Sequence, residues 1–256
     1  MTARQLIFDI ERIPMRTKAL AAWDMKSLQY RRLTPDDIDR WSRTVCLAYQ
    51  WEGEKKIGFI AEWHEGRVEF LLKAQALIDE ADILIGHNSK GFDYPHLLGE
   101  FLLEGIDAPS PVKHIDTLLL ARRFANFEAN HLDTLDKRFG HRGKTDKYRI
   151  EVAEAAVAGD AKMQRKIELY NRGDIRATKR VKDTLLPYVN VNLGLYEDDP
   201  TLPVCPKCSS RKLQRRGFAV KAALRYPRFQ CQGCGGWSTS KTADRQAGSV
   251  EMRPAT

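Results

Sequence analysis

The chain has no apolar run that approaches the ~18 residues of a membrane-spanning helix. Its N-terminal segment, MTARQLIFDI, also lacks the apolar stretch and small-residue cleavage site of a secretion signal. These absences predict a cytoplasmic protein with no membrane partner. The 256 residues, 43% of them hydrophobic, suffice for one large domain and a small additional module.

Cysteine is scarce, with five residues in the chain, and its placement is uneven. Cys46 stands alone in the strand-like run VCLAYQW, where a buried structural role is expected. The other four form two C-x₂-C pairs, Cys205 with Cys208 and Cys231 with Cys234. In a chain without a secretion signal, such pairs favour a metal site over disulfides. Because four thiolates satisfy tetrahedral Zn²⁺, we predict one zinc ion here.

Acidic residues are scarce near the C-terminus. Residues 201–256 contain 11 Lys and Arg but 2 Asp and Glu, whereas residues 1–200 contain 31 and 32. The net charge of +8 therefore belongs to the segment with the paired cysteines. Basic side chains there alternate with aromatic ones, a composition that suits phosphate contact and base stacking. The candidate nucleic-acid contacts are Arg215, Arg216, Arg225 and Arg228. A protein-docking role, with the aromatics as a small core, is the alternative.

The pattern of apolar residues predicts an α/β fold with a mixed sheet and flanking helices. Strands are expected at 4–10, 45–51, 55–63, 81–88 and 112–117. Helices are expected at 66–80, 92–105, 117–126, 130–139, 151–158 and 160–189, with a bend near Gly173 in the last. We expect a first domain at 1–195, a linker at 196–200, a cysteine module at 201–240 and a disordered tail at 241–256.

Acidic side chains in three separate segments are the main functional signal. Asp9 and Glu11, in LIFDIE, share one face of the first expected strand because strand side chains alternate. Two adjacent carboxylates at a buried strand repel each other and resist desolvation, so a divalent cation is their simplest partner. Asp93 begins an expected helix, where plain helix capping is the alternative. Tyr170 and Asp174 are four residues apart, so a helix presents both on one face.

Taken together, the D-x-E strand, the N-x-x-x-F-D loop and the Y-x-x-x-D helix resemble the tyrosine-bearing branch of the DEDD exonuclease superfamily. The segment from Ile85 to Leu97 is especially similar to the exonuclease domain of B-family DNA polymerases and its stand-alone bacterial and phage relatives. The resemblance covers roughly residues 4–189 and implies a ribonuclease H-like fold. It implies two Mg²⁺ or Mn²⁺ ions on the four carboxylates, with Asp9 bridging them and Tyr170 orienting a water molecule.

The activity implied by this resemblance is stepwise 3′→5′ removal of nucleoside 5′-monophosphates from DNA ends. Asn88 matches a family position near the terminal nucleotide, with loop hydrogen bonding as the alternative. Phe92 is either a base wedge or a core residue, and Asp116 is either near the site or a local helix cap. The cysteine module resembles a zinc ribbon, in which the metal is structural because the site is closed.

Two other functions remain open from the sequence. The same carboxylates would serve an exoribonuclease, since no residue identifiably reads a 2′-hydroxyl. A non-catalytic nucleic-acid-binding or recruitment protein would retain the same fold, although the presence of all four carboxylates and Tyr170 argues against it.

Overall fold

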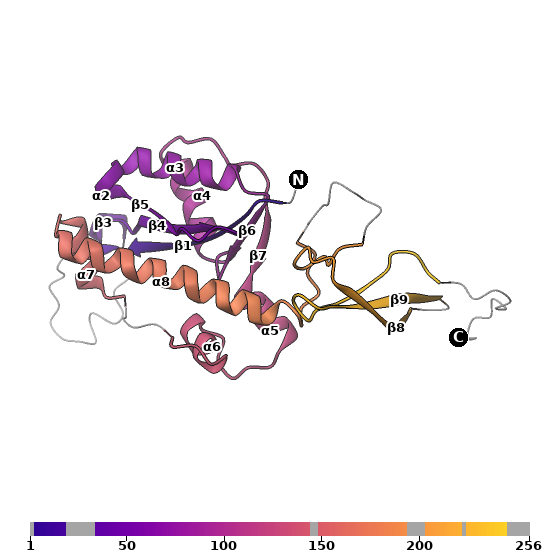
Figure 1. The fold of residues 1–256 in the computed structure, drawn as a ribbon. Coiled ribbons are helices and arrows are strands. Elements are labelled where there is room, and N and C mark those ends of the chain that lie inside the picture. The colour runs from indigo at the N-terminus through magenta and orange to yellow at the C-terminus, as the bar shows by residue number, and fades with distance from the viewer. Residues whose placement is uncertain (1–2, 19–33, 144–147, 194–202, 222–223, 245–256) are drawn as a thin grey trace.

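The computed structural model describes residues 3–18, 34–143, 148–193, 203–221 and 224–244 (Figure 1). The expected linker at 196–200 and the last part of the expected tail, 245–256, lie outside these ranges. Within the described ranges, no helix has both the length and the apolar character needed to cross a membrane.

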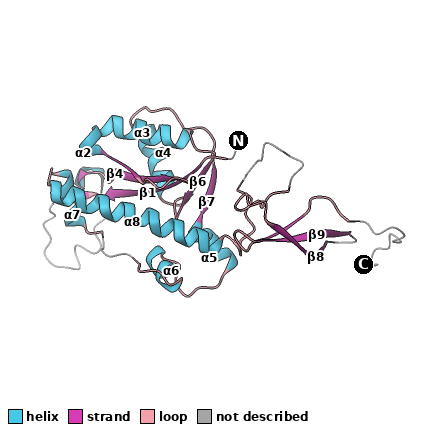
Figure 2. Cartoon of the chain, in the orientation of Figure 1, coloured by secondary structure: helices cyan, strands magenta, loops and turns pink. Residues whose placement is uncertain are grey.

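A five-stranded mixed sheet forms the centre of the larger domain (Figure 2). Its strands, in spatial order, are β5 (Gly58–Ala61), β4 (Arg43–Trp51), β1 (Gln5–Ile13), β6 (Ile83–Gly86) and β7 (Lys113–Asp116). The central strand β1 runs antiparallel to β4 and parallel to β6. The mixed α/β sheet predicted from the apolar pattern is therefore confirmed.

Helices cover both faces of this sheet, as Figure 1 shows. One face packs against α3 (Arg67–Asp79) and α4 (Asp93–Leu103), which contact Leu6, Phe8 and Ile10 of β1. The opposite face, which carries Ile7, packs against the long helix α8 (Ala161–Leu185). Because side chains alternate along a strand, Asp9 and Glu11 share the α8 face. Strand alternation therefore directs both acidic side chains of β1 toward α8.

The remaining helices support α8 or connect the strands. They are α2 (Glu62–Glu65), α5 (Thr117–Phe124), α6 (Leu132–Arg138) and α7 (Ile150–Val157), with a short 3₁₀ turn η1 (Pro35–Asp37). A small two-stranded antiparallel sheet, β2 (Arg16–Thr17) with β3 (Ile38–Arg40), was not predicted. The helix α8 runs without interruption through Gly173, near which the sequence predicted a bend.

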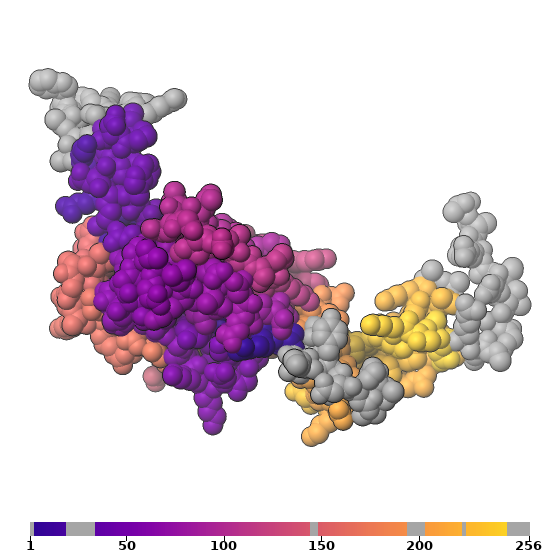
Figure 3. All heavy atoms as spheres, turned by 90° about the horizontal axis from the view of Figure 1, so that it is seen from above, coloured from indigo at the N-terminus to yellow at the C-terminus, as the bar shows by residue number. Residues whose placement is uncertain are grey.

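The cysteine module lies at the C-terminal end of α8 and forms a separate lobe (Figure 3). It contains a three-stranded sheet of β8 (Leu213–Lys221), β9 (Leu224–Cys231) and β10 (Trp237–Thr239). Residues 241–244 of the expected tail belong to this lobe, because the Asp244 amide donates to the Arg225 carbonyl at 2.8 Å.

Candidate active site

Three carboxylates from two distant segments meet where β1 faces α8. Asp9, Glu11 and Asp174 each place one carboxylate oxygen within 4.8 Å of the others. Glu11 is 9% exposed and Asp174 is 4% exposed, so the group is largely shielded from water. Three negative charges at this separation repel each other strongly. Hard divalent cations take such oxygen ligands, so these residues fit a Mg²⁺ or Mn²⁺ site.

Asp93 lies beside this cluster, at the first position of α4. It is 4% exposed, and its Oδ1 accepts the amide of Ile10 at 3.1 Å. Burial, together with the charges of Asp116 and Asp174, raises the pKa of Asp93 to about 7, although hydrogen bonds from backbone amides oppose the shift. The structure thus places the Asp93 side chain against the strand residue that separates the two acidic positions of β1.

Tyr170 lies one helical turn before Asp174 and is half-buried. Its ring centroid is 6.1 Å from that of Tyr148, whose hydroxyl donates to the Arg12 carbonyl at 2.6 Å. Burial, followed by the charge of Glu11, raises the pKa of Tyr148 well above its usual range. Tyr148 was not predicted from the sequence, and it connects the Tyr170 face of α8 to the end of β1.

Asn171 is a further member of the site that sequence reasoning missed. It is fully buried, and its amide nitrogen donates to the Asp9 carbonyl at 3.2 Å and to Asp9 Oδ2 at 2.7 Å. The bond to Oδ2 orients the Asp9 carboxylate, and the bond to the carbonyl holds Asn171 against the β1 backbone. The available signal was its place three residues before Asp174, which puts both side chains on one face of α8.

The loop after β6 is held in place by Asp116. Its carboxylate accepts the amides of Asn88 at 2.9 Å and Lys90 at 3.0 Å, and that of Leu118 at 2.9 Å. Asp116 therefore caps α5 and fixes the loop, which is the local alternative considered from the sequence. The backbone of Asn88 has a φ of 65°, a conformation that asparagine adopts more readily than most residues. Its side chain is exposed.

Phe92 is 43% exposed, so the core-packing alternative is wrong. Its ring meets that of His96 edge-on, with centroids 4.6 Å apart. His87 is held between the Thr117 hydroxyl and the Asn130 carbonyl, each at 2.9 Å, which indicates a structural role.

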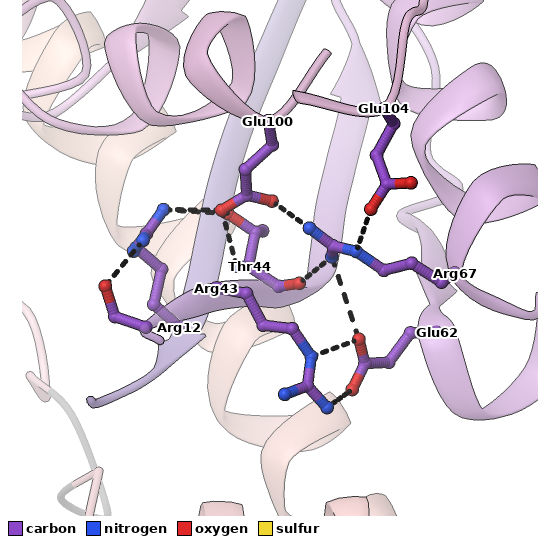
Figure 4. Close-up of polar contacts among 8 residues, drawn as sticks. Arg12, Arg43, Thr44, Glu62, Arg67, Glu100 and Glu104 are labelled. Atoms are coloured by element: carbon purple, nitrogen blue, oxygen red, sulfur yellow. Dashed lines mark hydrogen bonds and ion pairs between the residues drawn. The ribbon is translucent and has the colours of Figure 1, made fainter. Parts of the chain in front are cut away.

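A polar network anchors α4 to the two central strands, as Figure 4 shows. Glu100, 5% exposed, accepts hydrogen bonds from Arg12 at 2.7 Å, from the Thr44 amide at 2.8 Å and from Arg67 at 2.8 Å. Because Glu100 lies seven residues after Asp93, both side chains project from the same face of α4. The network therefore fixes the helix that carries Asp93 against the strand that carries Glu11.

Replacing Glu100 by alanine is expected to lower the free energy of unfolding by about 3 kcal/mol. The substitution leaves two partly buried guanidinium groups, Arg12 and Arg67, without this carboxylate. Glu104→Ala is the matched control, since it removes a more exposed partner of Arg67 at 3.5 Å and should cost less than about 1 kcal/mol. Urea unfolding of both variants measures the difference, and equal losses would contradict the anchoring role.

Comparison with known proteins identifies the family of the chain. The model of the RNase H superfamily matches residues 41–186, which is more than half of the chain. The chain belongs to the RNase H superfamily. The match includes Asp93, Tyr170 and Asp174 but begins after β1, so Asp9 and Glu11 lie before it.

A solved structure supports the same fold for this RNase H-superfamily chain. The chain is similar to the solved structure of the family B DNA polymerase from the hyperthermophilic archaeon Pyrobaculum calidifontis, with a TM-score of 0.52 at 17% sequence identity. The alignment covers 72% of this chain and 25% of the polymerase chain. No curated protein matches. The ribonuclease H-like α/β fold expected from the resemblance is thereby confirmed.

A cavity of about 590 Å³ opens beside the carboxylate cluster of the RNase H-superfamily domain. Tyr170 and Asp174 lie in its wall, together with basic side chains from α8 and from the segment that follows α6. These basic side chains are His141, Arg142, Lys166, Arg176 and Arg180. A cavity with acidic and basic walls suits a phosphodiester, because the cation site and the phosphate contacts lie side by side.

The four cysteines of the C-terminal module converge as predicted. One sulfur of each lies within 4.8 Å of the others, and the Sγ–Sγ distances are 3.7 Å for Cys205–Cys234 and 3.6 Å for Cys208–Cys231. A tetrahedral zinc site with Zn–S distances of about 2.3 Å requires sulfurs about 3.8 Å apart. The Gly233 amide also donates to the Cys231 sulfur at 3.3 Å. The arrangement is consistent with a zinc ribbon.

The four arginines singled out in this module lie on its sheet. The Arg225 and Arg215 guanidinium groups lie 4.2 Å and 5.0 Å from the Phe218 ring centroid. Arg228 lies 5.0 Å from the Trp237 ring, and its Nε donates to the Arg216 carbonyl at 3.1 Å. Basic and aromatic groups are thus interleaved in space as well as in sequence, away from the carboxylate cluster.

Proposed function

We propose that this protein is a metal-dependent 3′→5′ exonuclease that releases nucleoside 5′-monophosphates from DNA. The observation that carries the proposal is the convergence of Asp9, Glu11 and Asp174 oxygens within 4.8 Å, beside a cavity with basic walls. In this proposal the protein belongs to the tyrosine-bearing branch of the DEDD exonucleases. Its RNase H-superfamily fold and its similarity to a DNA polymerase support that choice.

In this proposal each residue of the cluster has a distinct role. Asp9, Glu11, Asp93 and Asp174 would hold two Mg²⁺ or Mn²⁺ ions. Such ions, when bound, lower the pKa of water and neutralise charge on a departing oxygen. The Asn171 amide keeps Asp9 in one orientation, and Tyr170 orients the attacking water from the adjacent helical position. Basic residues around the cavity bind the flanking phosphates.

The test is digestion of 5′-labelled single-stranded DNA with Mg²⁺ or Mn²⁺. We expect a ladder of products shortened from the 3′ end and nucleoside 5′-monophosphates as the small product. EDTA should abolish the ladder. Release of the 5′ label as a mononucleotide at the start of digestion would contradict the proposed polarity. Activity that survives EDTA would contradict the proposed metal dependence.

RNA is the second candidate substrate, and the same assay decides it. Parallel digestion of DNA and RNA of identical sequence compares kcat/KM for the two directly. We expect faster hydrolysis of DNA. Binding of both nucleic acids without any turnover would instead favour a recruitment protein with an RNase H fold.

The cysteine module would hold a zinc ion on Cys205, Cys208, Cys231 and Cys234 and act as a zinc ribbon that helps hold the substrate. Asn88 and Phe92 would contact the terminal nucleotide, since both are exposed. The division into a domain at 1–195 and a ribbon at 201–240 is part of this proposal.

Asn171→Ala is expected to lower kcat by about 10- to 100-fold, the range for residues that orient metal ligands. The metal concentration for half-maximal activity should rise as well, because the Asp9 carboxylate loses its hydrogen bond from the Asn171 amide. Arg165→Ala is the control, since that side chain is 61% exposed on the same helix. A lower melting temperature with unchanged metal dependence would mean that Asn171 is merely structural.

A further inference from the structure

A second cavity, of about 640 Å³, lies where the end of α8 meets the cysteine module. Tyr188 and Val189 line it from the residues that follow α8. Lys207, Gly235 and Trp237 line it from the two cysteine knuckles and β10. The cavity is therefore shared by two lobes and is separate from the carboxylate cluster on β1.

Two large aromatic side chains at this cavity are exposed. Tyr188 is 80% exposed and Trp237 is 44% exposed. Single exposed apolar residues are ordinary, but two aromatic side chains that share one cavity form a candidate binding surface. The Arg228 guanidinium lies 5.0 Å from the Trp237 ring centroid, so positive charge adjoins the aromatic face.

Direct bonds hold the two walls of the cavity together. Lys207 is 5% exposed, and its ammonium donates to the Pro187 carbonyl at 2.8 Å. The Leu193 amide donates to the Pro206 carbonyl at 2.9 Å. A Cβ atom at Gly236 would come within 2.8 Å of the Lys207 side chain, which shows how closely this lysine packs against the second knuckle. The cavity is thus built by specific contacts between the lobes.

The helix α8 connects this cavity to the carboxylate cluster. From Asp174 to its last residue, Leu185, the helix rises about 17 Å, and Pro187 follows directly. Arg176 and Arg180 lie on this stretch and line the basic cavity beside the cluster. At the ~3.4 Å spacing of stacked nucleotides, roughly five nucleotides cover that distance, and fewer do so when the strand is extended.

We infer that the junction cavity formed by Tyr188, Lys207 and Trp237 binds a base of single-stranded nucleic acid whose 3′ end lies at the carboxylate cluster. The inference rests on the proposed nuclease function and adds a contact upstream of the cleaved bond. Stacking on Tyr188 and Trp237 is independent of sequence, since every base has an aromatic face. Positive charge beside the rings favours a polyanion over a neutral protein surface.

The test measures the affinity of labelled oligothymidylates by fluorescence anisotropy, with the full chain carrying Asp9→Asn so that the strand stays intact. For a strand of about eight nucleotides, Tyr188→Ala and Trp237→Ala should each weaken binding about tenfold. For a dinucleotide, which is too short to span α8, neither variant should change the affinity. Trp237→Phe should restore most of the affinity, because phenylalanine also stacks.

Trp41→Ala is the matched control, since Trp41 is 62% exposed between β3 and β4 and lies on neither cavity. Zinc content and melting temperature show that each variant is folded. Equal affinities for the longer strand across all three alanine variants would overturn the inference. If the unaltered chain hydrolyses no nucleic acid, the proposed nuclease function is wrong. The dependence of affinity on strand length would still test whether the junction cavity binds a base.

Discussion

Asp9→Asn is expected to lower kcat/KM for DNA hydrolysis by about 1000-fold or more. In the proposed two-metal site Asp9 would contact both cations, and one of its oxygens lies within 4.8 Å of ligand oxygens from Glu11 and Asp174. Loss of its charge removes several kcal/mol of transition-state stabilisation, and about 4 kcal/mol corresponds to a factor of 1000. Asparagine keeps the size of the side chain and an oxygen that can accept from Asn171.

The folded state should tolerate this substitution, because it relieves repulsion among three carboxylates. We therefore expect an unchanged or higher melting temperature together with the loss of activity. Asp107→Asn, at an exposed position after α4, is the control and should retain full activity. Rates are measured on 5′-labelled single-stranded DNA at saturating Mg²⁺. Comparable activity of the two variants would show that Asp9 holds no catalytic cation.

The part of the site that could be predicted from the sequence follows local periodicity. Alternation of side chains places Asp9 and Glu11 on one face of the strand β1. The helical repeat places Tyr170 and Asp174 on one face of the helix α8. Both rules depend on neighbours within four residues. The structure brings Asp9, Glu11 and Asp174 together because β1 is central in the sheet and α8 packs across it.

The residues that escaped prediction depend on partners far away in the chain. Asn171 acts through Asp9, 162 residues earlier, and Glu100 acts through Arg12, 88 residues earlier. The role of a buried polar side chain depends on its hydrogen-bond partner, which a single sequence does not reveal. The exposure of Phe92 and the cavity between Tyr188 and Trp237 likewise depend on how distant segments pack.

The ends of individual strands also depend on tertiary contacts that the sequence does not reveal. The strand expected at 55–63 is shorter in the structure, because α2 begins at Glu62. Conversely, the first strand extends to Ile13, three residues beyond its expected end, with an irregularity between Glu11 and Arg12. Hydrogen bonds to β4 sustain this extension, and their register is set by tertiary pairing.

We expect the fold of the cysteine module to depend on a bound metal, unlike that of the larger domain. Its strand β8 is mostly exposed, and β9 has one fully buried residue, Cys231. Such a small sheet buries too little apolar surface to offset the entropy of folding without a metal or a disulfide. Structural zinc contributes on the order of 10–16 kcal/mol at neutral pH. Burial and sulfur neighbours raise the pKa of Cys208, which opposes its thiolate form until a cation is bound.

Removal of zinc by a strong chelator is therefore expected to unfold the cysteine module and leave the RNase H-superfamily domain folded. Thiol titration measures this directly, because the chain has one cysteine outside the module. Four thiols should become reactive after chelation, while Cys46, fully buried in β4 with a pKa raised well above its usual range, should stay protected until denaturant is added. Cys208→Ser should give the three remaining module thiols the same reactivity without chelator. If the four sulfurs stay unreactive after chelation, or if Cys46 reacts together with them, zinc does not hold this module independently.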